Sequence, residues 1–79
     1  MLHRKKLTPF GREVRKYRVD TGETQADAAN AIGVSIASCS AIETGKKNVS
    51  NQFVNRVAMH FGLSGQEVES LKNLALIFG

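Results

Sequence analysis

Residues 24–48 read TQADAANAIGVSIASCSAIETGKKN, and the rest of the 79-residue chain is organised around this stretch. Thr24 can cap the start of one helix, and Gly33 permits the sharp reversal that ends it. Ser35 can then cap a second helix, which Gly45 would terminate. The stretch therefore predicts two short helices that are joined by a tight turn.

Small and apolar side chains form the inner faces of this helix pair. Ala28, Ala29 and Ile32 share one face of the first helix, and Cys39 and Ile42 share one face of the second. Two helices that cross steeply over a short turn need small side chains where their backbones approach, and Ala29 supplies one. The predicted arrangement is a helix-turn-helix, a unit that can place its second helix in the major groove of DNA.

A first helix is expected before this pair, over about residues 9–21. Thr8 is a suitable N-cap, Pro9 suits the first helical position, and Gly22 suits the residue that ends the helix. Its buried stripe, at helical spacing, is expected to comprise Phe10, Val14 and Tyr17.

Two further helices are expected after the pair. Ser50 can cap a fourth helix, which Gly62 would end. Ser64 and Glu67 form the S-x-x-E capping box of a fifth helix, over about residues 65–78. No segment alternates with period two for long enough to indicate a strand. The predicted fold is all-α: a compact five-helix domain in which helices 2 and 3 form the helix-turn-helix.

The positive charge of the chain lies mainly before position 20. The whole chain has 11 Lys and Arg residues against 7 Asp and Glu residues, which gives a formal net charge of +4. A basic region on a small domain suggests a polyanionic partner, most simply nucleic acid, although a solvated helix face is the alternative. Residues 1–7 are expected to form a flexible basic arm, and residues 8–79 the domain. The basic residues of the region are Arg4, Lys5, Lys6, Arg12, Arg15, Lys16 and Arg18.

Composition and spacing argue against several other functions. The one cysteine, Cys39, rules out an internal disulfide and a cysteine-based zinc site, and it fits a reducing cytoplasm. His3 and His60 have no nearby ligand set, so no metal or cofactor is expected. The sequence has no glycine-rich phosphate loop, paired carboxylates or Ser/His/Asp arrangement, so we expect no enzyme. Its most apolar run, residues 74–78, is too short to span a membrane.

The pattern T-Q-x-x-A-A-x-x-I-G-V-S, followed by I-E-x-G-K-K-N, resembles the lambda-repressor and Cro-like helix-turn-helix family, also called XRE-type regulators. The resemblance covers about residues 8–68. In that family the third helix enters the major groove, and dimers read two half-sites. The resemblance implies a cytoplasmic, bacterial or phage-encoded transcription regulator. It would bind double-stranded DNA sequence-specifically, as a repressor that acts as a homodimer on a palindromic operator.

The resemblance also implies which residues meet DNA. Gln25, at the start of the second helix, would anchor a phosphate, where helix N-termini offer free N–H groups to anions. The other residues expected at the DNA backbone are Ser38, Thr44, Lys46, Lys47 and Asn48. The residues expected at base edges are Ser35, Ile36, Ala37, Ser40 and Ala41.

The expected reading helix has an unusually plain sequence. No Arg, Lys, Gln or Asn lies between Ser35 and Glu43, although bidentate reading of guanine or adenine uses these side chains. Small and apolar side chains can pack on thymine methyls, and serines can bond to bases or phosphates. Either specificity rests on methyl contacts, DNA shape and the arm, or this helix does not read bases. The arm residues that resemble the basic arm of lambda-type repressors are Arg4, Lys5 and Lys6.

Two further implications concern contacts inside the domain. The family pairs a glutamate of the third helix with an arginine of the first, which predicts a salt bridge between Arg18 and Glu43. If partly exposed, such a pair contributes about 1 kcal/mol or less to the stability of the fold. Ala28 and Cys39 are smaller than the family's usual residues, so aromatic side chains are expected to fill the core.

Apolar residues at positions where the family is commonly polar indicate a partner surface. Phe53 and Met59 are two of them, and residues 74–78 are apolar almost all round the fifth helix. The preferred hypothesis is a symmetric homodimer through the end of that helix. Its expected surface residues are Leu74, Ile77 and Phe78. The alternative is an antitoxin-type or adaptor protein that binds another protein through its exposed apolar face.

Overall fold

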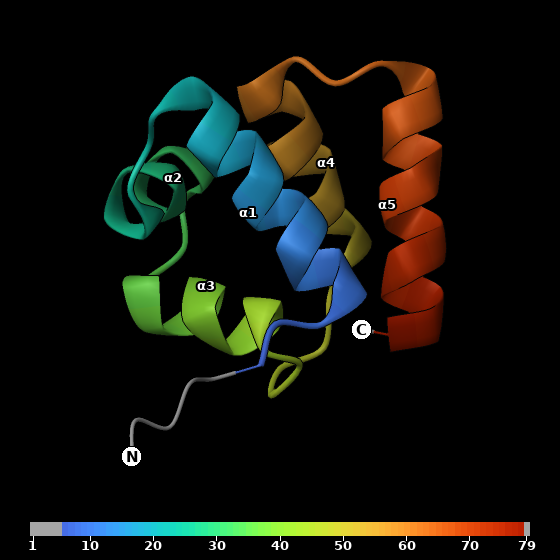
Figure 1. Ribbon diagram of the computed structural model, residues 1–79, viewed down its shortest axis with the longest axis horizontal. Coiled ribbons are helices and arrows are strands. Elements are labelled where there is room, and N and C mark those ends of the chain that lie inside the picture. Colours follow the sequence, from blue (N-terminus) through green and yellow to red (C-terminus); the bar gives the residue numbers. More distant parts are fainter. Residues whose placement is uncertain (1–5, 79) are drawn as a thin grey trace.

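A computed structural model describes the backbone of residues 6–78 and the side chains of residues 6–76. This range contains five α-helices and no strand (Figure 1). The helices are α1 (Pro9–Thr21), α2 (Gln25–Ile32), α3 (Ile36–Glu43), α4 (Asn51–Phe61) and α5 (Gly65–Phe78). The predicted all-α, five-helix fold is confirmed. Arg4 and Lys5 lie outside the described residues, as do the side chains of Ile77 and Phe78.

The helix starts are fixed by the capping side chains that the sequence indicates. The Thr8 hydroxyl accepts a hydrogen bond from the Gly11 N–H at the start of α1. At the start of α2, Thr24 and Asp27 form a reciprocal capping box, in which each side chain accepts the other residue's N–H. The Ser35 and Ser50 hydroxyls each accept one N–H at the starts of α3 and α4. Ser64 and Glu67 form a second reciprocal capping box at the start of α5.

The core lies between α1, α2, α4 and α5, and α3, which lies across one end of α1, adds Ile42 to it (Figure 1). Phe10 and Phe53 meet inside it, with their ring centroids 6.2 Å apart. Together they supply volume to a core that also contains the small Ala28. At its edge Tyr17 stacks on Phe61 at 5.8 Å. The buried apolar residues are Phe10, Val14, Ala28, Ala29, Ile32, Cys39, Ile42, Phe53, Val54, Val57 and Leu71.

The expected apolar partner surface is only partly present. Phe53 was expected on it and this was wrong: the side chain is 4% exposed, because it fills the core beside Phe10. Met59 is 84% exposed. On α5, Leu71 is fully buried and Leu74 packs partly against the core, whereas Leu76 is 85% exposed. Among the described helices, none is both long and apolar enough to cross a membrane.

Candidate nucleic-acid interface

The turn between α2 and α3 is built on a glycine. Gly33 has φ 89°, in the left-handed region that glycine adopts without strain. Its N–H and that of Val34 both donate to the Ala29 carbonyl, at 2.9 and 3.0 Å. The Arg56 guanidinium of α4 donates to the Ile32 carbonyl at 3.3 Å. It thereby provides a partner for one of the carbonyl groups that have no partner within α2 at its C-terminal end. This contact could not be predicted from the sequence.

The candidate base-contacting residues lie on the accessible side of α3. Ile36 is 53% exposed, Ser35 and Ala37 are exposed, and Ser40 and Ala41 are half-buried. The opposite face of the helix packs against the domain, and its side chains Cys39, Ile42 and Glu43 are all buried. Through this division α3 packs on the domain with one face and leaves small and apolar side chains on the other.

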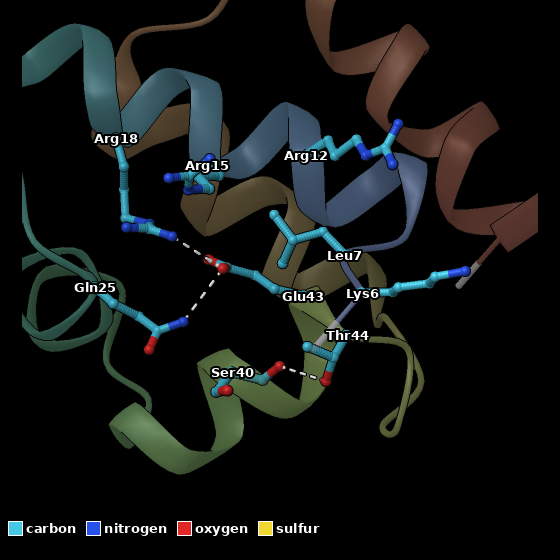
Figure 2. Close-up of a pocket in the computed structure, with 9 residues that line it drawn as sticks. All are labelled: Lys6, Leu7, Arg12, Arg15, Arg18, Gln25, Ser40, Glu43 and Thr44. Carbon is cyan, nitrogen blue, oxygen red and sulfur yellow. Dashed lines mark hydrogen bonds and ion pairs between the residues drawn. The ribbon is translucent and has the colours of Figure 1, made fainter. Parts of the chain in front are cut away.

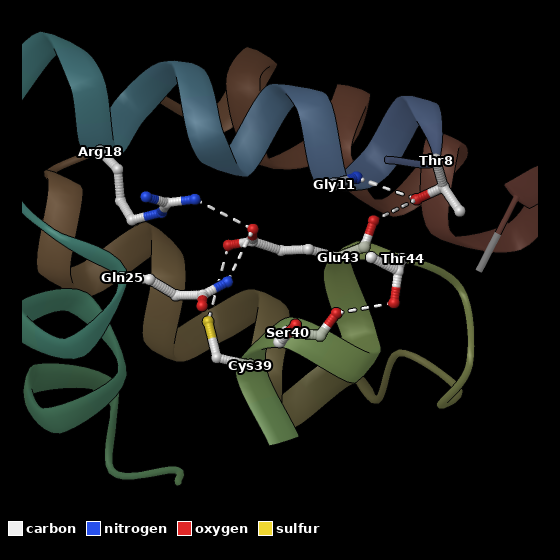
Figure 3. A network of polar contacts seen from close by, with 8 residues as sticks. All are labelled: Thr8, Gly11, Arg18, Gln25, Cys39, Ser40, Glu43 and Thr44. Carbon is white, nitrogen blue, oxygen red and sulfur yellow. Dashed lines mark hydrogen bonds and ion pairs between the residues drawn. The ribbon is translucent and has the colours of Figure 1, made fainter. Parts of the chain in front are cut away.

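A buried carboxylate connects α1, α2 and α3. Glu43 is 1% exposed, and its Oε1 accepts from Arg18 Nη2 at 3.0 Å and from Gln25 Nε2 at 3.2 Å (Figure 3). Its Oε2 accepts from Cys39 Sγ at 3.6 Å. Arg18 and Glu43 therefore lie together as the resemblance implied, but the pair is buried rather than partly exposed. Removing one partner of a buried pair costs about 3–5 kcal/mol, so the smaller estimate for an exposed pair does not apply.

The main chain of the same glutamate binds the start of α1. The Thr8 N–H donates to the Glu43 carbonyl at 3.0 Å, and the Thr8 hydroxyl lies 3.4 Å from it (Figure 3). A Cβ atom on Gly11 would lie 2.0 Å from the Glu43 carbonyl oxygen, which is far closer than van der Waals contact allows. Gly11 thus lets the backbones of α1 and α3 touch, a role that sequence inspection missed.

The loop after α3 folds back on the helix. The N–H groups of Lys46 and Lys47 donate to the Ala41 carbonyl at 2.8 and 3.2 Å. The Lys47 ammonium lies 3.4 Å from the half-buried Ser38 hydroxyl. Lys46, Lys47 and Asn48 are exposed, while the Thr44 hydroxyl donates to the Ser40 carbonyl at 2.8 Å.

An open groove of about 700 Å³ lies where α1, the start of α2 and α3 meet (Figure 2). Cationic side chains of α1 and of the preceding segment form one side, and Gln25 with the polar residues of α3 forms the other. Of the expected arm, Lys6 and Leu7 have described side chains, and both line this groove. The lining residues are Lys6, Leu7, Arg12, Arg15, Arg18, Gln25, Ser40, Glu43 and Thr44. We call this the α1–α3 groove.

The remaining chemistry-bearing residues of the described range include Cys39 and His60. Burial, followed by the nearby Glu43 carboxylate, raises the pKa of Cys39 to about 11, so its thiol stays protonated near neutral pH. No cluster of His, Cys, Asp and Glu among the described residues could hold a metal ion. The His60 ring lies 2.6 Å from a Glu23 oxygen, where it joins α4 to the connection between α1 and α2.

Comparison with known protein families identifies the type of domain. A family model described as a helix-turn-helix domain matches residues 9–71, which is most of the chain. A domain of this type points to DNA binding and to transcription regulation. Searches of curated proteins and of solved structures gave no significant match.

Proposed function

We propose that this chain, which belongs to the helix-turn-helix domain family, is a sequence-specific regulator of transcription of the lambda-repressor and Cro-like type. In this proposal α3 enters the major groove of double-stranded DNA, and the chain, encoded by a bacterium or a phage, acts as a repressor in the cytoplasm. The observation that carries it is the division of α3. Its inner face is fixed through Glu43 to α1 and α2, and its outer face is left accessible.

Phosphate contacts are proposed at both ends of this unit. Gln25 lies at the first turn of α2, where free N–H groups favour an anion, and Glu43 holds its side chain in place. The exposed Lys46 and Lys47 project from a loop that is hydrogen-bonded to α3. The proposed backbone-contacting residues are Gln25, Ser38, Thr44, Lys46, Lys47 and Asn48. Contacts of this kind position a protein on DNA without reading its sequence.

Base reading is proposed for the plain outer face of α3. Ile36 and Ala37 can pack on thymine methyl groups, and the Ser35 and Ser40 hydroxyls can bond to base edges. Because no long polar side chain lies on this face, the proposed specificity also depends on DNA shape.

We further propose a homodimer that forms through the end of α5. The 85% exposure of Leu76 supports this, because a large apolar side chain gains from a covering partner. Leu74, Ile77 and Phe78 are the residues proposed beside it. Sedimentation equilibrium over a protein concentration series tests the proposal, and a monomer throughout the series would end it.

A second candidate function is an adaptor or antitoxin-type protein that binds another protein. The observation in its favour is Met59, which is 84% exposed on α4. Phe53 does not contribute, because it is buried.

Selection from a random library of duplex DNA tests the main proposal. The protein is expected to enrich a palindromic sequence, and its affinity should fall steeply as the salt concentration rises, because phosphate contacts release counterions. Salt-dependent binding without enrichment would support docking without base reading. Absence of binding at low salt would favour the protein-interaction module.

A further inference from the structure

The cationic residues that line the α1–α3 groove outnumber its acidic residues. Its one acid, Glu43, is already paired with Arg18 at 3.0 Å. Arg12 and Arg15 are exposed, and neither has a carboxylate within 4.0 Å among the described residues. Lys6 adds a further cation at the same groove. The groove is therefore suited to a polyanion.

The groove is continuous with the surface already proposed to meet DNA. Gln25, Ser40 and Thr44, which were assigned to DNA from the resemblance, line it opposite the α1 arginines (Figure 2). Arg12 and Arg15 come from one helix at a spacing of three residues, so their Cα atoms are displaced by about 4.5 Å along the axis. A DNA strand carries one phosphate per about 3.4 Å of helix axis, so a strand along the groove presents phosphates to both arginines, whose side chains diverge along α1 (Figure 2).

We propose that one DNA strand passes along the α1–α3 groove and that Arg12 and Arg15 contact its phosphates. The DNA-binding surface then extends from the helix-turn-helix onto the outer face of α1. This inference rests on the proposed function, since it assigns a further part of the same binding surface. Because α3 offers no long polar side chain, these contacts supply affinity that the reading helix does not.

The test is the salt dependence of duplex binding by the Arg12→Gln/Arg15→Gln variant of the full chain. Each lost phosphate contact lowers the slope of log affinity against log salt concentration by about 0.9, so the variant should lose about 1.8 of the wild-type slope. Its relative affinity for two different duplexes should stay the same, because phosphate contacts carry no sequence information. The Arg12→Lys/Arg15→Lys variant should keep most of the slope, since it keeps both charges.

A matched control lowers the net charge by two elsewhere. Lys72 of α5 does not line the groove, whereas Lys16 lines a neighbouring hollow together with Arg12 and Arg15 and is left unchanged. The Lys72→Glu variant has the same net charge as the arginine variant and should keep a slope near that of the wild type. Circular dichroism melting of each variant checks that the fold is retained, since Arg12 and Arg15 are exposed and Lys72 is half-buried.

The outcomes separate this inference from the proposed function. A wild-type chain that binds duplex DNA with a steep salt dependence, together with an unchanged slope in the arginine variant, would overturn the inference alone. Equal slope losses in the Arg12→Gln/Arg15→Gln and Lys72→Glu variants would also overturn it, because the effect would then come from net charge. A wild-type chain that fails to bind duplex DNA at low salt would overturn both.

Discussion

At Gly11 the backbone of α1 meets the backbone of α3 with no side chain between them. A Cβ atom there would lie 2.0 Å from the Glu43 carbonyl oxygen and 2.7 Å from its carbon. Both neighbours are main-chain atoms, so a rotamer change cannot relieve the contact. The close approach also brings the Thr8 N–H to the same carbonyl at 3.0 Å. A single residue type thus sets the distance between two helices.

We expect Gly11→Ala to lower the free energy of unfolding by about 3 kcal/mol, the upper part of the usual range for overpacking. Urea denaturation followed by circular dichroism measures the change. The control is Gly65→Ala, because a Cβ on Gly65 meets no atom within 4 Å. That variant should be as stable as the wild type, and equal losses in both variants would contradict the interpretation.

The buried pair gives the second prediction at this scale. Glu43→Leu leaves the Arg18 charge buried without its partner, so we expect a loss of about 3–5 kcal/mol in the free energy of unfolding. The Arg18→Met/Glu43→Leu double variant removes both charges and should recover a substantial part of that loss. Urea unfolding of all three chains forms the test. If the double variant were less stable than Glu43→Leu, the unpaired Arg18 charge could not be the cause of the stability loss in Glu43→Leu.

Among the elements, the helix bounds could be predicted far better than the contacts between helices. Caps and terminating glycines are local signals, so Thr8, Thr24 and Ser50 marked the starts of α1, α2 and α4 correctly. Phe53 was misplaced because its burial depends on Phe10, which is distant in sequence. The close approach at Gly11 could not be predicted, because a glycine within a helix does not indicate which backbone packs against it.

The α1–α3 groove could not be predicted for a related reason. The basic residues of α1 were visible in the sequence, and so were the serines and small side chains of α3. Their arrangement on opposite sides of one groove depends on how α1 crosses α3, which is fixed by the contacts of Glu43. Gln25 was expected at a phosphate, whereas its hydrogen bond to Glu43 appears only in the fold.

The link between α4 and the α1–α2 connection gives a prediction about pH. A hydrogen bond from His60, and then one from Thr21, hold the pKa of Glu23 below its usual value of 4.5. A carboxyl with a lowered folded-state pKa stabilises the fold above its unfolded pKa, and this contribution is lost as the pH falls through the folded value. The His60→Ala variant should therefore raise the pKa of Glu23 towards 4.5, as followed by NMR titration.

The same variant has a consequence for stability. The difference in unfolding free energy between wild type and His60→Ala should shrink as the pH falls below about 4.5, because the Glu23 contribution disappears from the wild type. Urea unfolding at a series of pH values measures it. A difference that grows on acidification would contradict the assigned direction.

For the whole molecule, positive charge and small size act together. A net charge of +4 on 79 residues favours association with a polyanion, and the salt concentration then controls affinity. The proposed surface divides into the backbone-contacting loop with Lys46 and Lys47, the α1–α3 groove, and the apolar face of α3. Loss of affinity and loss of specificity should therefore be separable.

We expect Lys46→Ala/Lys47→Ala to weaken binding to all duplexes by a similar factor. Ile36→Glu should instead abolish preferential binding to the selected sequence, because a carboxylate would face base edges and phosphates in place of an apolar group. Ile36 is 53% exposed, so the fold should persist. Competition binding with selected and scrambled duplexes separates the effects. A changed sequence preference in the lysine variant would contradict its assignment to the DNA backbone.

Because Cys39 is buried, its reaction with a thiol reagent can report on opening motions of the domain. It is the one cysteine of the sequence, it is 0% exposed, and its thiol is protonated near neutral pH. A thiol-reactive dye can reach the sulfur only when the contact between α3 and the domain opens. The labelling rate therefore measures how often α3 detaches, without any engineered probe. Comparing that rate with and without duplex DNA would show whether DNA closes the domain around its reading helix.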